Sequence, residues 1–333
     1  MSHSIKVAQF GLGPIGQNCL HLLAKDPRFE IVGAVDINPQ FVGQSVAEVC
    51  GLAENLGGFV RASFEDLWAV HQPDAVLHTA GSRASTSFAQ CRPMVERGVA
   101  VVSSCEELLF PWHRAPDETR MMDELCRRFG GRILGTGVNP GFVLDVLPVV
   151  LSTVACAVRG VQGTRVVNAS LRRQPLQKKI GSGLAPEEFR RLWREGKAGH
   201  AGFQESLCLL AHALQWKMGA ITENLEPVLA EREVCTEFFH VQPGQTRGLH
   251  QTVSAVSDHG CRIHLDLTMA LDEESPQDRV ILDSEPALEM VVPGGVSGDR
   301  ATVASLVNAL PRLLRTAPGV RLMTDLPLTV GES

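Results

Sequence analysis

Two adjacent glutamates follow a short apolar run in the stretch VAVVSSCEELLFP, residues 99–111. Residues 99–103 are apolar or small and predict a buried strand, and Glu106 and Glu107 then open a helical segment next to Cys105. A carboxylate at such a position can pair with an ammonium or iminium group, and it can move protons between water, ammonia and a carbinolamine. The pair therefore indicates amine chemistry, and either glutamate could be the acting group.

Two simpler interpretations of this segment exist. Acidic residues are favoured in the first turn of a helix by the helix dipole, and we expect one of the two glutamates to have only that role. Cys105 could be a nucleophile, but no histidine or basic residue stands near it in the sequence to stabilise a thiolate. We therefore interpret Cys105 as a small packing residue.

A glycine-rich turn near the N-terminus indicates a bound dinucleotide. Gly11, Gly13 and Gly16 form the pattern GxGxxG, directly after the apolar run IKVAQF and directly before a helical segment. The first glycine permits the tight turn, the second lets backbone approach a pyrophosphate, and the third lets helix and strand pack closely. The free N–H groups at the start of the helix would then bind the phosphates.

An acidic residue follows the second predicted strand. Asp36 lies 20 residues after Gly16, where a carboxylate accepts hydrogen bonds from both hydroxyls of the adenosine ribose. A 2′-phosphate would be repelled by that charge, and the residues INPQ that follow offer no arginine to receive it. NAD is therefore the predicted cofactor, although Lys25 or Arg28 could relax the preference, and NADP stays possible.

The carboxyl ends of parallel strands meet at one edge of a sheet, where ligands bind. Three such ends, LHTAGS, VVSSCEE and GTGVNPGF, are expected to converge near the nicotinamide. Asn308, a polar residue on the apolar face of the last predicted helix, is expected to hydrogen-bond to the cofactor or to a buried turn. The predicted cofactor-binding residues are Gly11, Gly13, Pro14, Ile15, Gly16, Asp36, Thr79, Ala80, Ser82, Ser104, Cys105, Asn139 and Asn308.

The elements that must position these residues form two domains. Strands at 5–11, 29–36, 74–81, 99–104 and 132–137 alternate with helical segments, which predicts a Rossmann-type, doubly wound parallel sheet. Residues 138–299 mix helices with alternating strands and predict an α+β domain with an open, mixed or antiparallel sheet; residues 170–183 are expected to be a basic loop. The amphipathic helix at 299–319 is expected to return to the first domain, which would comprise 1–137 and about 300–333.

Composition excludes several classes of protein. The net charge is −6, and no dense stripe of lysine and arginine occurs, so neither nucleic acid nor an anionic membrane is an expected partner. No apolar run approaches the length of a membrane helix, and the N-terminus shows no signal-peptide pattern. The nine irregularly spaced cysteines contain no CxxC, which favours reduced thiols in a cytoplasm. We expect no metal site, because the histidines show no ligand spacing: His200, His212, His240, His250, His259 and His264.

The chain resembles the 2,4-diaminopentanoate dehydrogenase family, which includes NAD(P)-dependent native amine dehydrogenases. The resemblance rests on GLGPIG, SSCEELLFP, GTGVNPGFVLDVLP, RRQPLQKKIGSG and GDRATVASLVNALPRLLRTAPG, spread in order over nearly the whole chain. It implies a Rossmann domain, a substrate and dimerisation domain, a homodimer, and reversible deamination of an amine to a ketone or aldehyde and ammonia. It also implies that a glutamate of the CEEL segment meets the amine, and the position of lysine in related oxidoreductases favours Glu107.

The catalytic motif of dihydrodipicolinate reductases, to which the family is related in fold, is absent from the sequence. The substrate of those reductases is therefore not expected. A diamine would need a second polar or acidic anchor, which the sequence does not identify, so a simple aliphatic or arylalkyl amine or ketone is at least as plausible a substrate. Two other functions stay open: an NAD-dependent alcohol or aldehyde dehydrogenase in which the glutamates are structural, and a dinucleotide sensor without catalysis. The expected walls of the substrate pocket are Pro140, Gly141, Phe142, Leu147, Leu176 and Met269.

Overall fold

The computed structural model describes residues 4–53 and 56–328 and divides the chain into two compact units. Unit 1 comprises Met1–Gly141 and Ser297–Ser333, and unit 2 comprises Phe142–Val296. The sequence placed these divisions at 137/138 and 299/300, while the chain ends at 1–3 and 329–333 lie outside the described residues. The roles assigned to the two domains, dinucleotide binding and substrate binding with dimerisation, stay predictions.

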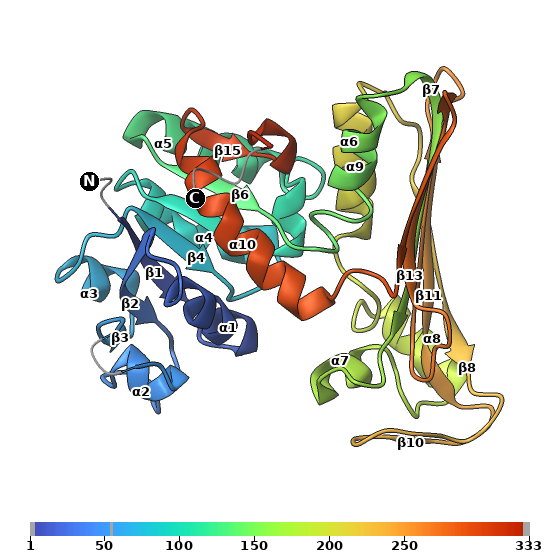
Figure 1. Cartoon of the computed structure of the whole chain (residues 1–333), viewed down its shortest axis with the longest axis horizontal. Helices are drawn as coiled ribbons and strands as arrows, with labels where there is room; N and C mark the ends of the chain where they lie inside the picture. Colours follow the sequence, from blue (N-terminus) through green and yellow to red (C-terminus); the bar gives the residue numbers. More distant parts are fainter. Residues whose placement is uncertain (1–3, 54–55, 329–333) are drawn as a thin grey trace. The chain divides into compact units, whose positions relative to one another are not determined.

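The sheet of unit 1 is parallel throughout, which confirms the predicted fold class (Figure 1). The chain runs outward from β1 in one direction and then in the other, so the strand order reverses between β1 and β4. In open α/β sheets, ligands bind in the crevice at such a reversal, outside the carboxyl ends of the strands. The spatial order is β15 (Gly319–Arg321), β6 (Arg132–Gly135), β5 (Ala100–Ser103), β4 (Ala75–His78), β1 (Ile5–Phe10), β2 (Phe29–Val35) and β3 (Val60–Arg61).

Helices cover both faces of this sheet. One layer contains α1 (Pro14–Leu23), α2 (Val46–Cys50) and α10 (Gly298–Leu314); α10 packs on α1 and against β4, β5 and β6, so the last long helix returns to unit 1. The other layer contains α3 (Phe64–Trp68), α4 (Ala84–Val95) and α5 (Pro116–Phe129). Short 3-10 helices lie at η1 (Glu106–Leu109) and η2 (Met323–Asp325).

Unit 2 is built on a mixed sheet, as predicted. Strands β12 and β7 pair in parallel, and all other neighbours in the sheet are antiparallel. A small hairpin, β9 with β10, stands apart from it. The spatial order of the large sheet is β14 (Leu288–Pro293), β13 (Gln277–Glu285), β7 (Cys156–Asn168), β12 (Arg262–Ala270), β11 (Thr246–Val256) and β8 (Thr222–Leu229), and the hairpin strands are β9 (Val234–Cys235) and β10 (His240–Val241).

The helices of unit 2 cover one face of its large sheet. Helices α6 (Val146–Ser152), α8 (Pro186–Arg194) and α9 (Phe203–Ala213) pack on it, and apolar strand residues such as Ile263 and Leu265 are buried beneath them. Alternating residues such as Arg262 and His264 point to the opposite, more exposed face. The predicted basic loop at 170–183 in fact contains the short helix α7 (Gln174–Lys179), which begins with a proline in its first turn.

Candidate active site

The glycine turn between β1 and α1 has the geometry that its residue types require. Gly11 has a φ of +90°, where a side chain would be strained, and a Cβ on Gly16 would lie 2.0 Å from the carbonyl oxygen of Gly11. A Cβ on Gly13 would meet no atom within 4 Å among the described residues, so the backbone is open there. Pro14 occupies the first turn of α1, followed by the half-buried Ile15.

The start of α1 is suited to an anion. Among the described residues no side chain caps this N-terminus, and its first turn holds no acidic residue. Its free N–H groups and positive dipole end are therefore available to phosphate oxygens. Together with the open backbone at Gly13, this arrangement fits the pyrophosphate of a dinucleotide.

Gln9 fixes the glycine turn from below, and sequence reasoning missed this residue. Its side chain is fully buried, and Nε2 donates to the carbonyl oxygen of Gly11 at 3.0 Å and to Oγ1 of Thr79 at 2.9 Å. Oγ1 of Thr79 in turn donates to the same oxygen of Gly11 at 3.0 Å. The signal in the sequence was the lone side-chain amide inside the apolar run IKVAQF. Through these hydrogen bonds, Gln9 ties the ends of β1 and β4 together.

Asp36 follows β2 and lies against the glycine turn. Its Oδ2 accepts a hydrogen bond from the backbone N–H of Leu12 at 2.6 Å, and its Oδ1 accepts one from the N–H of Asn38 at 2.8 Å. Each carboxylate oxygen keeps a further lone pair for a ligand hydroxyl. The neighbouring Ile37 is 88% exposed, which leaves an apolar side chain beside the carboxylate on the open rim of the sheet.

Backbone hydrogen bonds bring the predicted strand ends together. The N–H groups of Thr79, Ser104 and Thr136 donate to the last residues of the neighbouring strands, at 2.8, 2.9 and 2.9 Å respectively. These bonds continue the ladder past the ends of β4, β5 and β6 and place the three residues side by side. Ala80 and Ser82 follow on the β4 side, half-buried and exposed respectively.

A buried histidine organises the turn that precedes the glutamates. His78, fully buried, contacts Oγ of Ser103 through Nδ1 and Oε1 of Gln90 through Nε2, both at 2.9 Å. Because Oε1 can only accept, Nε2 carries the proton and Nδ1 accepts from the Ser103 hydroxyl. Oγ of Ser103 also accepts from the N–H of Cys105 at 3.1 Å. Through Ser103, the imidazole therefore helps to fix the backbone of Cys105, the residue before Glu106.

We predict that His78 is a positioning residue whose loss lowers turnover. Burial lowers the pKa of His78, so the folded protein holds it neutral, and unfolded protein takes up a proton below about pH 6.5. The contribution of His78 to the free energy of unfolding should therefore be fully present above that pH and should be lost as the pH drops below it. His78→Leu should cost about 1–3 kcal/mol by leaving Ser103 and Gln90 unpaired, weaken the pH dependence of unfolding, and lower kcat more than it raises KM.

The variant His78→Asn serves as the matched control for this prediction. Its amide can replace Nδ1 toward Ser103 and should restore part of kcat. Urea unfolding at several pH values and steady-state kinetics measure the two effects. Equal kcat in all three proteins would show that His78 has no influence on the turn.

The two glutamates have different surroundings at the start of η1. Glu107 accepts a hydrogen bond through Oε2 from the N–H of Ala84 at 2.7 Å, and its Oε1 lies 3.5 Å from Nη1 of Arg83. It thereby caps α4, for which Arg83 provides no side-chain cap. Glu106 is half-buried, and its carboxylate has no hydrogen-bond or ion-pair partner within residues 4–53 and 56–328. Glu106 is therefore the carboxylate of the pair that can bind a ligand without losing a partner.

Cys105 lies in the core of unit 1. Its side chain is 1% exposed, and burial raises the pKa of the thiol to about 11, which holds it protonated at neutral pH. A protonated, buried thiol is a poor nucleophile. Any contact of this residue with a cofactor would have to come from its backbone.

The remaining predicted residues are distributed over both units. After β6, Asn139 is half-buried and Pro140 and Gly141 are buried, and Asn308 is half-buried on α10. Phe142, 39% exposed, and Leu147 are linked by a backbone hydrogen bond of 2.8 Å at the start of unit 2. Leu176 is half-buried on α7, and Met269 is buried on β12. The pocket they would form stays a prediction.

None of the described helices is long and apolar enough to cross a membrane.

The two units together define a Rossmann-fold protein with a second α+β domain. Residues 142–331 match the model of the 2,4-diaminopentanoate dehydrogenase C-terminal domain, and this match covers more than half of the chain. The chain belongs to the 2,4-diaminopentanoate dehydrogenase family, as its motifs indicated.

Individual relatives resemble the chain over nearly its whole length. It is 28% identical over 330 residues to a 2,4-diaminopentanoate dehydrogenase of Acetoanaerobium sticklandii, covering 97% of this chain and 94% of that one. It is 24% identical over 351 residues to an amine dehydrogenase of Streptomyces virginiae, covering 97% and 96%. The solved structure of an amine dehydrogenase from Mycobacterium smegmatis has the same fold, with a TM-score of 0.86, 23% identity and coverage of 98% and 97%.

Proposed function

We propose that this protein is an NAD(P)-dependent amine dehydrogenase, which interconverts an amine with a ketone or aldehyde and ammonia. Membership of the family and the names of its relatives support the reaction class. The observation that carries the proposal is the half-buried Glu106, whose carboxylate has no partner within the described residues and which follows β5, two strands away from the dinucleotide-type glycine turn after β1. Steady-state oxidation of NADH that requires both a ketone and ammonium tests it.

The chain's residues fit the dinucleotide in unit 1. The N-terminus of α1 and the open backbone at Gly13 would bind the pyrophosphate, and Asp36 would bind the ribose hydroxyls. Asn308, on the helix packed beside α1, and the backbone around Ser104 are further proposed contacts. When bound, the nicotinamide supplies the acceptor or donor of hydride.

In this proposal, Glu106 carries out the proton transfers. Its carboxylate pairs with the substrate ammonium and passes one of its protons to solvent, which leaves the neutral amine. The substrate carbon then loses hydride, and the carboxylate pairs with the iminium that remains. Water adds to the iminium carbon, and Glu106 takes the proton that this water releases and passes it to the nitrogen of the resulting carbinolamine. Ammonia leaves as the C–N bond breaks and the C=O bond forms, and it takes up the hydroxyl proton to become ammonium. The net reaction consumes amine, water and the oxidised dinucleotide, and it yields ketone, ammonium and the reduced dinucleotide. Glu107 holds the turn in place through Ala84.

We predict a preference for NADH over NADPH, set by Asp36. Asp36→Asn should relax it, because the amide oxygen can still accept from the N–H of Leu12 while the charge that repels a 2′-phosphate is gone. Arg28, the possible phosphate receiver, forms an ion pair with Asp26 at 2.6 Å. Weakened bonds to the ribose should lower kcat/KM for NADH about ten- to hundredfold. Kinetics with both cofactors measure this, and a wild-type enzyme that favours NADPH would contradict it.

Further parts of the proposal concern substrate, assembly and compartment. The substrate is a simple aliphatic or arylalkyl amine, with apolar side chains such as Phe142 and Leu147 as pocket walls. The enzyme is a homodimer, joined through the face of the large sheet in unit 2 that its helices leave uncovered. It works in the cytoplasm, which is supported by nine free cysteines.

A further inference from the structure

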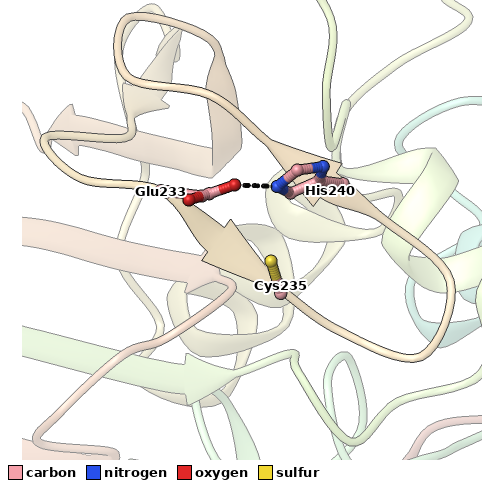
Figure 2. Close-up of side chains that lie close together, drawn as sticks. All are labelled: Glu233, Cys235 and His240. Atoms are coloured by element: carbon pink, nitrogen blue, oxygen red, sulfur yellow. Dashed lines mark hydrogen bonds and ion pairs between the residues drawn. The ribbon is translucent and has the colours of Figure 1, made fainter.

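Three side chains of different chemistry gather on the β9–β10 hairpin of unit 2. Strand pairing places Cys235 opposite His240 and Val234 opposite Val241. Glu233 stands two residues before Cys235 and therefore points to the same side of the hairpin. One ligand atom from each of Glu233, Cys235 and His240 lies within 4.8 Å of the other two, and Figure 2 shows the three side chains turned toward one another.

The hairpin is held by its opposite face and by its turn. Val234 and Val241 are 5% and 0% exposed, so their burial keeps the face with Cys235 and His240 outward. Oγ1 of Thr236 accepts from the N–H of Phe239 at 3.0 Å and donates to Oε1 of the buried Gln177 at 2.8 Å. The backbone that bears the three side chains is therefore fixed before any ligand arrives.

The charge of the surroundings favours a cation. A groove of about 610 Å³ beside the hairpin is lined by four acidic and two basic side chains; it does not include the three clustered side chains, and its two arginines form ion pairs with three of its carboxylates. On the hairpin itself, the carboxylate of Glu233 contacts Nε2 of His240. The charged residues lining the groove are Glu231, Asp272, Glu273, Glu274, Arg232 and Arg247.

We propose that Glu233, Cys235 and His240 form a binding site for a zinc-class divalent cation, separate from the amine dehydrogenase chemistry. A thiolate, an imidazole and a carboxylate are the ligands that Zn²⁺ accepts in a tetrahedral site, and three protein ligands leave the fourth position to water. Mg²⁺ and Ca²⁺ require oxygen ligands and are disfavoured by the thiolate. Binding replaces the contact between His240 and Glu233 and releases the thiol proton of Cys235.

Zn²⁺ titration of chelator-treated protein, followed by calorimetry, tests the site. We expect one equivalent to bind, with an affinity that rises with pH because Cys235 and His240 must lose protons. Cys235→Ser and His240→Gln should each weaken binding by at least about tenfold. Co²⁺ should give a thiolate charge-transfer band that Cys235→Ser removes.

Cys156→Ser is the matched control, since Cys156 is also an exposed, free thiol of unit 2. It should leave both the affinity for Zn²⁺ and the Co²⁺ band unchanged, and circular dichroism should show all variants folded. Failure of the wild-type protein to bind Zn²⁺ would overturn the proposal. So would a Co²⁺ band that persists in Cys235→Ser or disappears in Cys156→Ser. None of these outcomes depends on dehydrogenase turnover.

Discussion

Glu106→Gln should reduce the rate of reductive amination by about 10²–10⁴-fold, the usual contribution of a positioned general acid or base. The amide keeps the size of the side chain but can neither pair with an iminium nor accept a proton. Because the Glu106 carboxylate has no partner within the described residues, its loss should leave the stability of the protein unchanged. Steady-state amination and thermal unfolding of the variant measure both effects.

Glu107 provides the internal control for this prediction. Glu107→Gln retains an oxygen that can accept from the N–H of Ala84, so both cap and activity should largely survive. Glu107→Ala should lose the cap of α4 and cost about 0.5–2 kcal/mol of stability. If Glu107→Gln instead abolishes amination and Glu106→Gln does not, the amine-binding role belongs to Glu107. If both variants keep full activity, the glutamates have no chemical role.

The second large effect concerns a buried ion pair in unit 2. Nη1 of Arg165 donates to both carboxylate oxygens of Asp278 at 2.8 Å, and the two side chains are 3% and 1% exposed. The pair also binds Val296, whose carbonyl oxygen accepts from Nη2 of Arg165 at 2.7 Å and whose N–H donates to Asp278 at 2.6 Å. It therefore fixes the last residue of unit 2, from which the chain returns to unit 1.

Arg165→Met should destabilise the protein by about 3–5 kcal/mol, because it leaves a carboxylate buried without its cation. Burial already raises the pKa of Asp278, and the guanidinium opposes that rise. Differential scanning calorimetry measures the loss. The double variant Arg165→Met/Asp278→Leu should recover part of it, because the unpaired charge is then gone.

An exposed pair on the same two strands is the matched comparison. Nη2 of Arg159 lies 2.8 Å from Oδ1 of Asp283, but the side chains are 57% and 64% exposed. Arg159→Met should therefore cost no more than about 1 kcal/mol, since solvent and salt screen the pair. Equal losses in Arg159→Met and Arg165→Met would show that burial of the charges does not determine the effect.

The fold and the glycine turn were predictable because their signals are local. Apolar runs, helical periodicity and GxGxxG each lie within one element or one turn, and the reversal in strand order follows from how such units connect. The predicted loop at 170–183 shows the limit of this approach. The first N–H groups of a helix have no partner within the helix, so a proline, which lacks an N–H group, is tolerated there. The helix α7 therefore forms even though its stretch contains a proline and many charged residues.

The site depends on contacts that local patterns do not encode. His78 and Ser103 are 25 residues apart, and Ala84 and Glu107 are 23 apart, yet the register of β4 with β5 makes them neighbours. The sequence left the choice between Glu106 and Glu107 open, with the resemblance favouring Glu107, whereas the proposal of Glu106 depends on contacts that this register creates. Likewise, Cys235 and His240 show no metal-ligand spacing, and only the pairing of β9 with β10 brings them together.

The most direct test of the proposed function follows both atoms that the reaction transfers. The protein is incubated with a panel of aliphatic and arylalkyl ketones, ammonium labelled with heavy nitrogen, and NADH deuterated at the transferred position. Mass spectrometry of the product should show an amine that contains the heavy nitrogen and one deuterium on the carbon bound to it. A deuterated alcohol without nitrogen, or tight NADH binding with no product across the panel, would contradict amine dehydrogenase activity.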